Sequence, residues 1–252
     1  MEGMKMRWTT ICFDLDNTLF SHEAAFESAI QHTFQNKYLK QTELTNEIDK
    51  KAWFDTFKKN SDYYWEDLEE NKLTHDEYRK VRFDETMKAF GLPYHESDAK
   101  QFHDEYENVV VQYCAPYQGM HTLLRSLHQA GIKLGIITNG KQNTQERKIA
   151  QLETDTYIPP SHIIISEDVG IEKPDRRIFD HALNKMNGDR DRALFIGDSW
   201  ELDVMGAIQA GWDAIFLNSR MEHKSSPDIP VAEHYDFLET TQFLLQSLDL
   251  KG

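Results

Sequence analysis

The stretch ICFDLDNTLF, residues 11–20, decides the fold of this 252-residue chain. Thr9 to Phe13 form a short run of β-prone residues that stops at an aspartate. Such a run predicts a buried strand followed by a loop. Asp14 and Asp16 would then lie just past the end of the first strand.

Residues 21–114 show the apolar period of helices and carry no strand signal, which predicts amphipathic helices. Thr74 followed by Glu77 predicts a capping box at the start of one helix. The apolar repeats are Phe26/Ile30/Phe34, Leu44/Ile48, Phe83/Met87/Phe90 and Phe102/Tyr106/Val109/Val110/Tyr113. We therefore expect an all-helical domain inserted after the first strand.

Beyond Tyr117, short runs rich in Ile, Leu and Phe alternate with helical segments. The runs are Leu134 to Thr138, His162 to Ser166, Ala193 to Gly197 and Asp213 to Leu217. This alternation predicts an α/β fold with a parallel sheet covered by helices on both faces. The expected domains are a sheet domain, residues 1–20 and 115–252, and the helical insertion, residues 21–114.

Charge and composition exclude several classes of protein. The formal net charge of −15 opposes general nucleic-acid binding and a polybasic membrane patch. There is no run of about 18 apolar residues to span a membrane, and the segment before Asp14 is too short and polar for a signal peptide. Cys12 and Cys114 show no metal-binding or disulfide pattern. We expect a soluble cytoplasmic protein.

Polar segments follow four of the predicted strands. Each is a weak signal alone, because aspartates often cap helices and Thr-Asn-Gly often forms a turn. The carboxyl ends of parallel strands converge on one crevice, so the four segments together predict a single site. They are Asp14-Leu15-Asp16-Asn17-Thr18, Thr138-Asn139-Gly140, Glu172-Lys173-Pro174-Asp175 and Gly197-Asp198-Ser199-Trp200-Glu201-Leu202-Asp203.

The residue types in these segments suit phosphoryl chemistry. Several carboxylates in one crevice repel one another unless a cation neutralises them, and oxygen ligands favour Mg²⁺. Thr138 and the N–H groups of Asn139 and Gly140 would form an anion cradle. Lys173 would place a positive charge on a transferring phosphoryl group. Asp14 and Asp16 suit a nucleophile and a general acid/base.

In their order along the chain and in their amino-acid sequence, the four segments resemble the motifs of the haloacid dehalogenase-like hydrolases. The resemblance covers the whole sheet domain and includes a helical cap inserted after the first strand. It implies a Rossmann-like parallel-sheet core, residues 1–20 and 115–252, that carries catalysis, and a cap, residues 21–114, that contributes specificity.

The resemblance also implies a role for each matching residue. Asp14 would be the nucleophile that forms an aspartyl-phosphate, and Asp16 the general acid/base. Thr138 would bind the phosphate with the Asn139 backbone. Lys173 would bind the phosphate too, and would stabilise the nucleophile.

A magnesium site follows from the same resemblance. Asp14, the Asp16 carbonyl and Asp198 would hold Mg²⁺, with Asp203 supporting the site. The carboxylate at Asp16 favours the phosphatase branch, because dehalogenase members lack an acid at that position. The transporting-ATPase branch has a lysine there and long membrane segments, which are absent from this sequence.

The expected activity is hydrolysis of a small phosphate ester. The sequence of residues 14–19 and 137–140 resembles that of members that act on pyrimidine nucleoside monophosphates. It is also similar to that of members that act on acidic sugar phosphates. Phosphoserine phosphatase and phosphotransferase or mutase activities are alternatives. A non-catalytic scaffold is disfavoured, because Asp14, Asp16, Lys173 and Asp198 are all present.

The helical insertion offers fewer signals about the substrate. His22, Glu23 and Phe26 follow closely on the first motif and would lie at the mouth of the site. The aromatic run 63–65, which contains Tyr64 and Trp65, could stack on a nucleobase. Aromatic residues in a small helical domain more often form its core.

Overall fold

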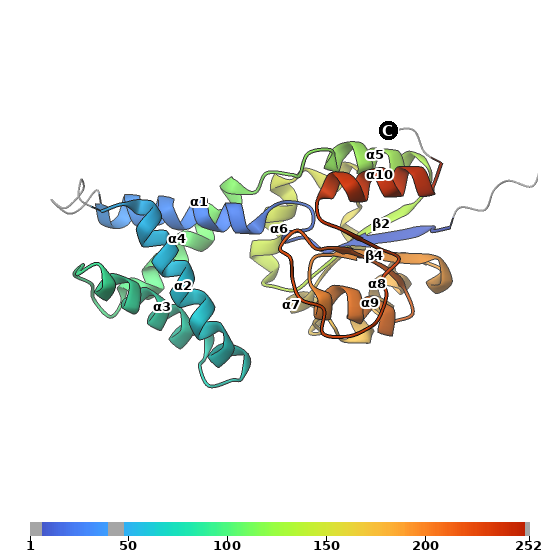
Figure 1. The fold of residues 1–252 in the computed structure, drawn as a ribbon. Helices are drawn as coiled ribbons and strands as arrows, with labels where there is room; N and C mark the ends of the chain where they lie inside the picture. The colour runs from blue at the N-terminus through green and yellow to red at the C-terminus, as the bar shows by residue number, and fades with distance from the viewer. Residues whose placement is uncertain (1–6, 40–47, 250–252) are drawn as a thin grey trace, which may run out of the picture. The chain divides into compact units, whose positions relative to one another are not determined.

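The computed structural model describes residues 7–39 and 48–249 (Figure 1). The chain divides into two compact units. The first, Met1–His22 with Cys114–Gly252, is the sheet unit; the second, Glu23–Tyr113, is the helical unit.

The sheet unit is built on six parallel strands in the order β3-β2-β1-β4-β5-β6. The strands are β1 Thr10–Phe13, β2 Lys133–Thr138, β3 Ile163–Ile165, β4 Ala193–Gly197, β5 Asp213–Leu217 and β6 Ala232–His234. Phe13 of β1 pairs in register with Ile136 of β2 and Ile196 of β4. β1 is therefore central, and the loop after it leaves between the ends of its two neighbours.

Helices cover both faces of this sheet, which confirms the predicted α/β class. In Figure 1, α5 and α10 lie on one face and α8 and α9 on the other. The core on the second face includes the ring of Phe179 against those of Phe195 and Trp212, at centroid distances of 5.2 and 5.9 Å. The α-helices are α5 Met120–Gln129, α6 Gln142–Gln151, α7 Ser166–Val169, α8 Arg176–Lys185, α9 Gly206–Gln209 and α10 Phe237–Ser247. Shorter helical turns are Thr154–Thr156, Pro160–His162, Arg190–Arg192 and the π-helical Trp200–Met205.

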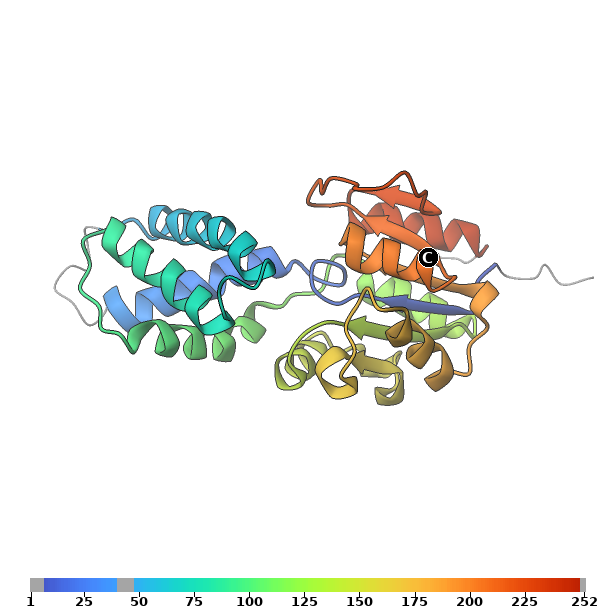
Figure 2. The ribbon, with the colours of Figure 1, turned by 90° about the horizontal axis from the view of Figure 1, so that it is seen from below.

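The helical unit packs around aromatic side chains. Trp53 stacks on Phe34 at 4.0 Å between ring centroids and on Phe57 at 5.3 Å. Figures 1 and 2 show α2 and α3 side by side. The helices are α1 His22–Phe34, which continues as π-helical Gln35–Leu39, α2 Lys50–Glu69, α3 His75–Ala89, α4 Asp98–Val109 and the 3-10 turn Val110–Tyr113. The repeat residue Leu44 lies outside the described residues.

The predicted capping box at the start of α3 is confirmed. Thr74 Oγ1 accepts a hydrogen bond from the Glu77 N–H at 3.2 Å, and Glu77 Oε2 accepts one from the Thr74 N–H at 2.8 Å. Two backbone donors of the first turn are thereby satisfied within the helix.

Among the helices of residues 7–39 and 48–249, none has both the length and the apolar character that a bilayer crossing requires.

We expect Thr74→Ala to lower the free energy of unfolding by about 1 kcal/mol, because one donor of the first turn of α3 loses its acceptor. Urea denaturation measures the change. Thr56→Ala, inside α2, is the matched control and should cost nothing, because alanine favours helices. Equal losses in both variants would contradict a capping role.

Candidate active site

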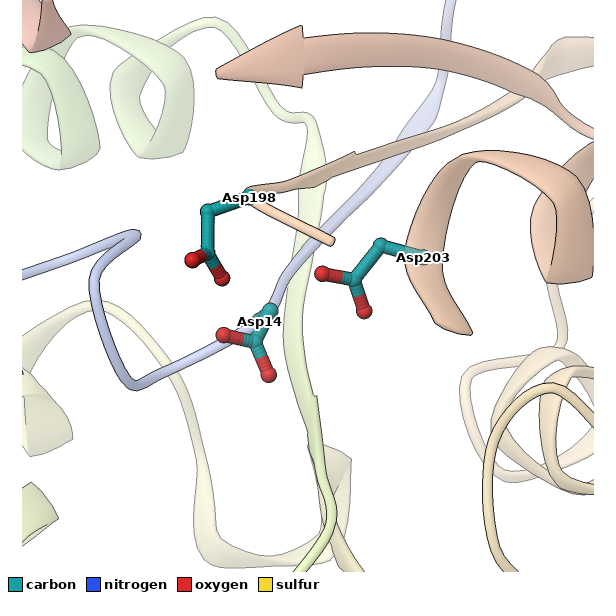
Figure 3. Close-up of side chains that lie close together, drawn as sticks. All are labelled: Asp14, Asp198 and Asp203. Carbon is teal, nitrogen blue, oxygen red and sulfur yellow. The ribbon is translucent and has the colours of Figure 1, made fainter. Parts of the chain in front are cut away.

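Three buried carboxylates meet at the carboxyl ends of the two central strands. Asp14 follows β1, and its N–H donates to the Ile196 carbonyl of β4 at 2.9 Å. Asp198 follows β4, and Asp203 lies in the π-helical turn Trp200–Met205. One carboxylate oxygen from each of Asp14, Asp198 and Asp203 lies within 4.8 Å of the others, and Figure 3 shows the three groups turned toward one another.

Lys173 joins two of these carboxylates. Its Nζ lies 2.6 Å from Asp14 Oδ1 and 2.6 Å from Asp203 Oδ1, and the residue is only 4% exposed. The Asn139 side chain holds the Lys173 backbone: Asn139 Oδ1 accepts from the Lys173 N–H at 2.9 Å, and Nδ2 donates to the Lys173 carbonyl at 3.0 Å. The loop after β2 thus fixes the main chain from which the lysine reaches the cluster.

A glycine at the end of β4 makes room for Asp203. A Cβ atom at Gly197 would lie 2.3 Å from Asp203 Oδ2, closer than any side chain allows. Asp203 Oδ2 also accepts a hydrogen bond from the Ser199 N–H at 3.0 Å. The absence of a side chain at residue 197 therefore lets the turn fold back and deliver this carboxylate to Lys173.

The cluster holds more negative than positive charge. Burial raises the pKa of Asp14 to about 7, with the charge of Asp203 adding to the rise and Lys173 opposing it. Burial, together with the charges of Asp14 and Asp203, raises the pKa of Asp198 to about 8, although Arg220 lies 2.8 Å from its Oδ2. Lys173 and Arg220 therefore do not fully offset the burial and mutual repulsion of Asp14 and Asp198.

Asp16 lies two residues from Asp14, but its carboxylate has a separate set of partners. Lys148 Nζ lies 2.8 and 2.9 Å from its two oxygens, and Gln145 Nε2 donates to Oδ2 at 3.1 Å. His22 Nδ1 lies 3.6 Å from Oδ1. Burial would raise the pKa of Asp16, but Lys148, His22 and the hydrogen bond from Gln145 outweigh it and lower the pKa below its ordinary value.

The predicted anion cradle is only partly available. Thr138 is buried at the end of β2, and its Oγ1 accepts a hydrogen bond from Gln145 Nε2 at 2.7 Å. The Gly140 N–H, predicted to face a phosphate, donates instead to Ser166 Oγ at 3.0 Å. The expectation for the Gly140 N–H is therefore wrong in this structure, because Ser166 in α7 provides a nearby acceptor.

Three residues of the site were not among those predicted: Gln145, Lys148 and Arg220. Gln145 and Lys148 lie three positions apart in α6 and share a face of that helix, where a polar residue gives no sequence signal of burial. Arg220 lies three residues past the end of β5. The rule that strand ends converge could have found Arg220, if it had been applied to the fifth strand.

The residues predicted to set specificity fall in two places. His22 belongs to the sheet unit, where it contacts Asp16. Tyr64 and Trp65 belong to α2 of the helical unit. Tyr63 and Trp65 are 73% and 47% exposed and Tyr64 is half-buried, so the expectation that this run forms the helical core is wrong. That core is formed by other rings, such as Phe34 and Trp53.

The donor set fits a divalent cation. Asp14, Asp198 and Asp203 offer only carboxylate oxygens, the ligands that hard cations prefer. Besides burial, the charges of Asp14 and Asp203 raise the pKa of Asp198, and a cation at this position would relieve the repulsion among these carboxylates. The cluster can therefore hold a cation next to the carboxylate that Lys173 contacts.

We expect the cation-free protein to lose stability as the pH rises from 6.5 to 8.5. Because the folded-state pKa values of Asp14 and Asp198 are raised to about 7 and 8, the folded state holds protons there that the unfolded chain has released. The pKa values of His103 and His234 are lowered, so these two residues change the stability mainly at lower pH. There the unfolded chain still binds protons at its histidines, and stability rises with pH.

Thermal melts in EDTA measure this effect, and we expect Tm to fall by about 5 °C over the window. Asp198→Asn should flatten the pH dependence, because one of the two titrating groups is gone. A Tm that stays constant or rises with pH in the unaltered protein would contradict the charge imbalance.

Residues 8–211 match the family of haloacid dehalogenase-like hydrolases. The chain is 28% identical over 224 residues to pyrimidine 5'-nucleotidase YjjG of Escherichia coli, covering 88% of this chain and 91% of that one. It is 29% identical over 245 residues to pyrimidine 5'-nucleotidase PynA of Streptococcus pneumoniae, covering 97% and 96%.

A magnesium-bound crystal structure of the HAD-hydrolase YfnB from Bacillus subtilis has the same fold, with a TM-score of 0.77 and 27% identity over 94% of this chain and 99% of that one. The family match, the parallel sheet and the buried acidic cluster lead to one conclusion: this chain belongs to the haloacid dehalogenase-like hydrolases and is an enzyme of that family.

Proposed function

We propose that the protein is a Mg²⁺-dependent phosphomonoesterase that hydrolyses a small phosphate ester through an aspartyl-phosphate on Asp14. One observation carries the proposal. Asp14 contacts Lys173 and belongs to a carboxylate cluster that can hold a cation, whereas Asp16, two residues away, contacts Lys148 outside that cluster. The two carboxylates thus have different partners, so Asp14 can contact phosphorus and the cation while Asp16 handles the proton.

In the first step, an Asp14 oxygen attacks phosphorus, and the bond between phosphorus and the ester oxygen breaks. The phosphate dianion bound beside Asp16 would raise the pKa of this carboxyl group against the opposing effect of Lys148, so that it takes up a proton and gives it to the departing oxygen. Lys173, 2.6 Å from Asp14, stabilises the negative charge of the nucleophile and of the phosphoryl group. Thr138 and the Asn139 backbone, at the end of β2, would hold the phosphate.

In the second step, the Asp16 carboxylate takes a proton from water, and the hydroxide attacks phosphorus. The bond to Asp14 breaks, which releases inorganic phosphate and restores both carboxyl groups to their starting states. Lys148 beside Asp16 favours the carboxylate form that this step needs.

We assign Mg²⁺ to Asp14, the main-chain carbonyl of Asp16 and Asp198, with Asp203 as a supporting residue. Bound Mg²⁺ would neutralise the cluster and stabilise charge on the phosphoryl oxygens. Local positive charge is needed because the chain carries a net charge of −15, which does not attract a phosphate dianion. Lys173 supplies a part of that charge, from within the cluster.

A pyrimidine nucleoside monophosphate is the substrate class we favour. Two relatives named pyrimidine 5'-nucleotidases support it, each matching over most of its own length and of this chain. The sequence of residues 14–19 and 137–140 supports it as well. Sugar phosphates and phosphoserine are the alternatives, as is transfer of the phosphoryl group to an acceptor hydroxyl. We place the enzyme in the cytoplasm, where the buried thiols of Cys12 and Cys114, neither of which forms a disulfide, would stay reduced.

Phosphate release by the purified protein tests the proposal. The panel consists of nucleoside monophosphates, sugar phosphates and phosphoserine, each with Mg²⁺ and with EDTA. We expect turnover that requires Mg²⁺, with pyrimidine nucleoside monophosphates ranked first. Asp14→Asn should keep less than about a tenth of the rate, because the nucleophile is lost.

Asp62→Asn is the matched control for that variant, because Asp62 forms an exposed ion pair with Lys58 in α2. It should leave the rate unchanged. Turnover in EDTA would overturn the assigned metal site. Phosphate release that appears only with an acceptor sugar would identify a phosphotransferase.

We further propose that Tyr64 and Trp65 in the helical unit bind the nucleobase by stacking. Trp65 is 47% exposed, so its ring is accessible to a nucleobase. Trp65→Ala should raise KM for the nucleotide about 10-fold, the range expected for one stacked base, with a small change in kcat. Tyr235→Ala, an exposed aromatic of the sheet unit, is the control. An unchanged KM in Trp65→Ala would exclude the stacking.

A further inference from the structure

Two polar side chains of α6 are directed at Asp16 from a buried position. Lys148 is 4% exposed and Gln145 is 2% exposed, and they lie three positions apart on one face of the helix. A buried ammonium group is costly unless a carboxylate compensates it. Lys148 places its Nζ 2.8 and 2.9 Å from the two oxygens of Asp16, so both oxygens contact the same cation.

Gln145 links the same carboxylate to the neighbouring loop. Its Nε2 lies 3.1 Å from Asp16 Oδ2, 2.7 Å from Thr138 Oγ1 and 3.2 Å from the Asn139 carbonyl. The loops after β1 and β2 are therefore tied together through one amide group. Rotation of the Asp16 side chain would break the contacts with both Lys148 and Gln145.

We infer that Lys148, assisted by Gln145, is a positioning residue that fixes the Asp16 carboxyl group for proton transfer to the leaving oxygen. The inference rests on the proposed function, and adds a residue outside the four strand-end segments to the machinery. Lys148 acts through Asp16 and has no assigned contact with the phosphate. Its removal should therefore harm only those steps that need Asp16.

The identity of the leaving group separates this role from a general structural one. An alkyl ester needs a proton on the departing oxygen as the bond to phosphorus breaks, whereas the phenolate of an activated aryl ester departs without one. The ratio kcat/KM covers the steps up to phosphorylation of Asp14. It therefore measures how strongly the rate depends on protonation of the leaving group. A variant that mispositions Asp16 should lose activity on alkyl esters selectively.

We would measure kcat/KM with saturating Mg²⁺ for p-nitrophenyl phosphate and for the best alkyl ester of the panel. Lys148→Met should lower the value for the alkyl ester about 100-fold and the value for p-nitrophenyl phosphate less than about 5-fold. Lys148→Arg, which keeps the charge, should recover about 10-fold or more of the loss. Arg147→Met, which removes a charge from the same helix and leaves Lys148 in place, should match the unaltered protein.

A double-mutant cycle on the alkyl ester, where Lys148→Met alone should cost about 100-fold, tests whether Lys148 acts only through Asp16. Asp16→Asn combined with Lys148→Met should equal Asp16→Asn alone within about twofold. Lys148→Gln, which keeps a polar group in the buried position, replaces Lys148→Met if melts show that the latter does not fold.

Three results would overturn the inference. The first is an equal loss on both esters, and the second is a further loss in the Asp16→Asn background. The third is an unaltered protein that releases phosphate from neither ester, which would overturn the proposed function as well. Normal activity in the unaltered protein with a uniform loss in the variants would reject the positioning role alone.

Discussion

Lys173 is shared between Asp14 and Asp203, all three residues are buried, and the rest of the site depends on this contact. Three buried carboxylates within 4.8 Å would repel one another strongly, and one ammonium group 2.6 Å from two of them offsets part of that cost. The offset is incomplete, because the pKa values of Asp14 and Asp198 stay raised to about 7 and 8. The remaining imbalance makes the cluster suitable for a cation.

The parallel sheet brings these groups together. β1 lies between β2 and β4, so the loops after three adjacent strands end at one edge. Each loop then makes a specific contribution: Asp14 comes from the first, Asn139 of the second holds the backbone of Lys173, and Asp198 comes from the third. Gly197 permits the close return of Asp203 to the same point. Packing in the sheet unit thus sets distances that no single loop could hold.

Two aspartates separated by one residue acquire opposite properties in this arrangement. Burial and a neighbouring carboxylate raise the pKa of Asp14, whereas Lys148 and Gln145 from α6 lower that of Asp16. Carboxyl groups whose environments move their pKa values apart are common at catalytic sites. Here the separation comes from a helix that contributes two side chains from one buried face.

The sequence by itself determined the α/β class, five of the six strands, the helical insertion and the capping box of Thr74, because these depend on local periodicity and local hydrogen bonds. It did not reveal β6, Ala232–His234, because this strand has only three residues, is half-exposed and contains a single apolar side chain. Only the tertiary structure placed Lys148 on Asp16, 132 residues away along the chain, and left Trp65 exposed. Polar contacts between distant segments leave no periodic signal, because the partner is chosen by how the helices and strands pack.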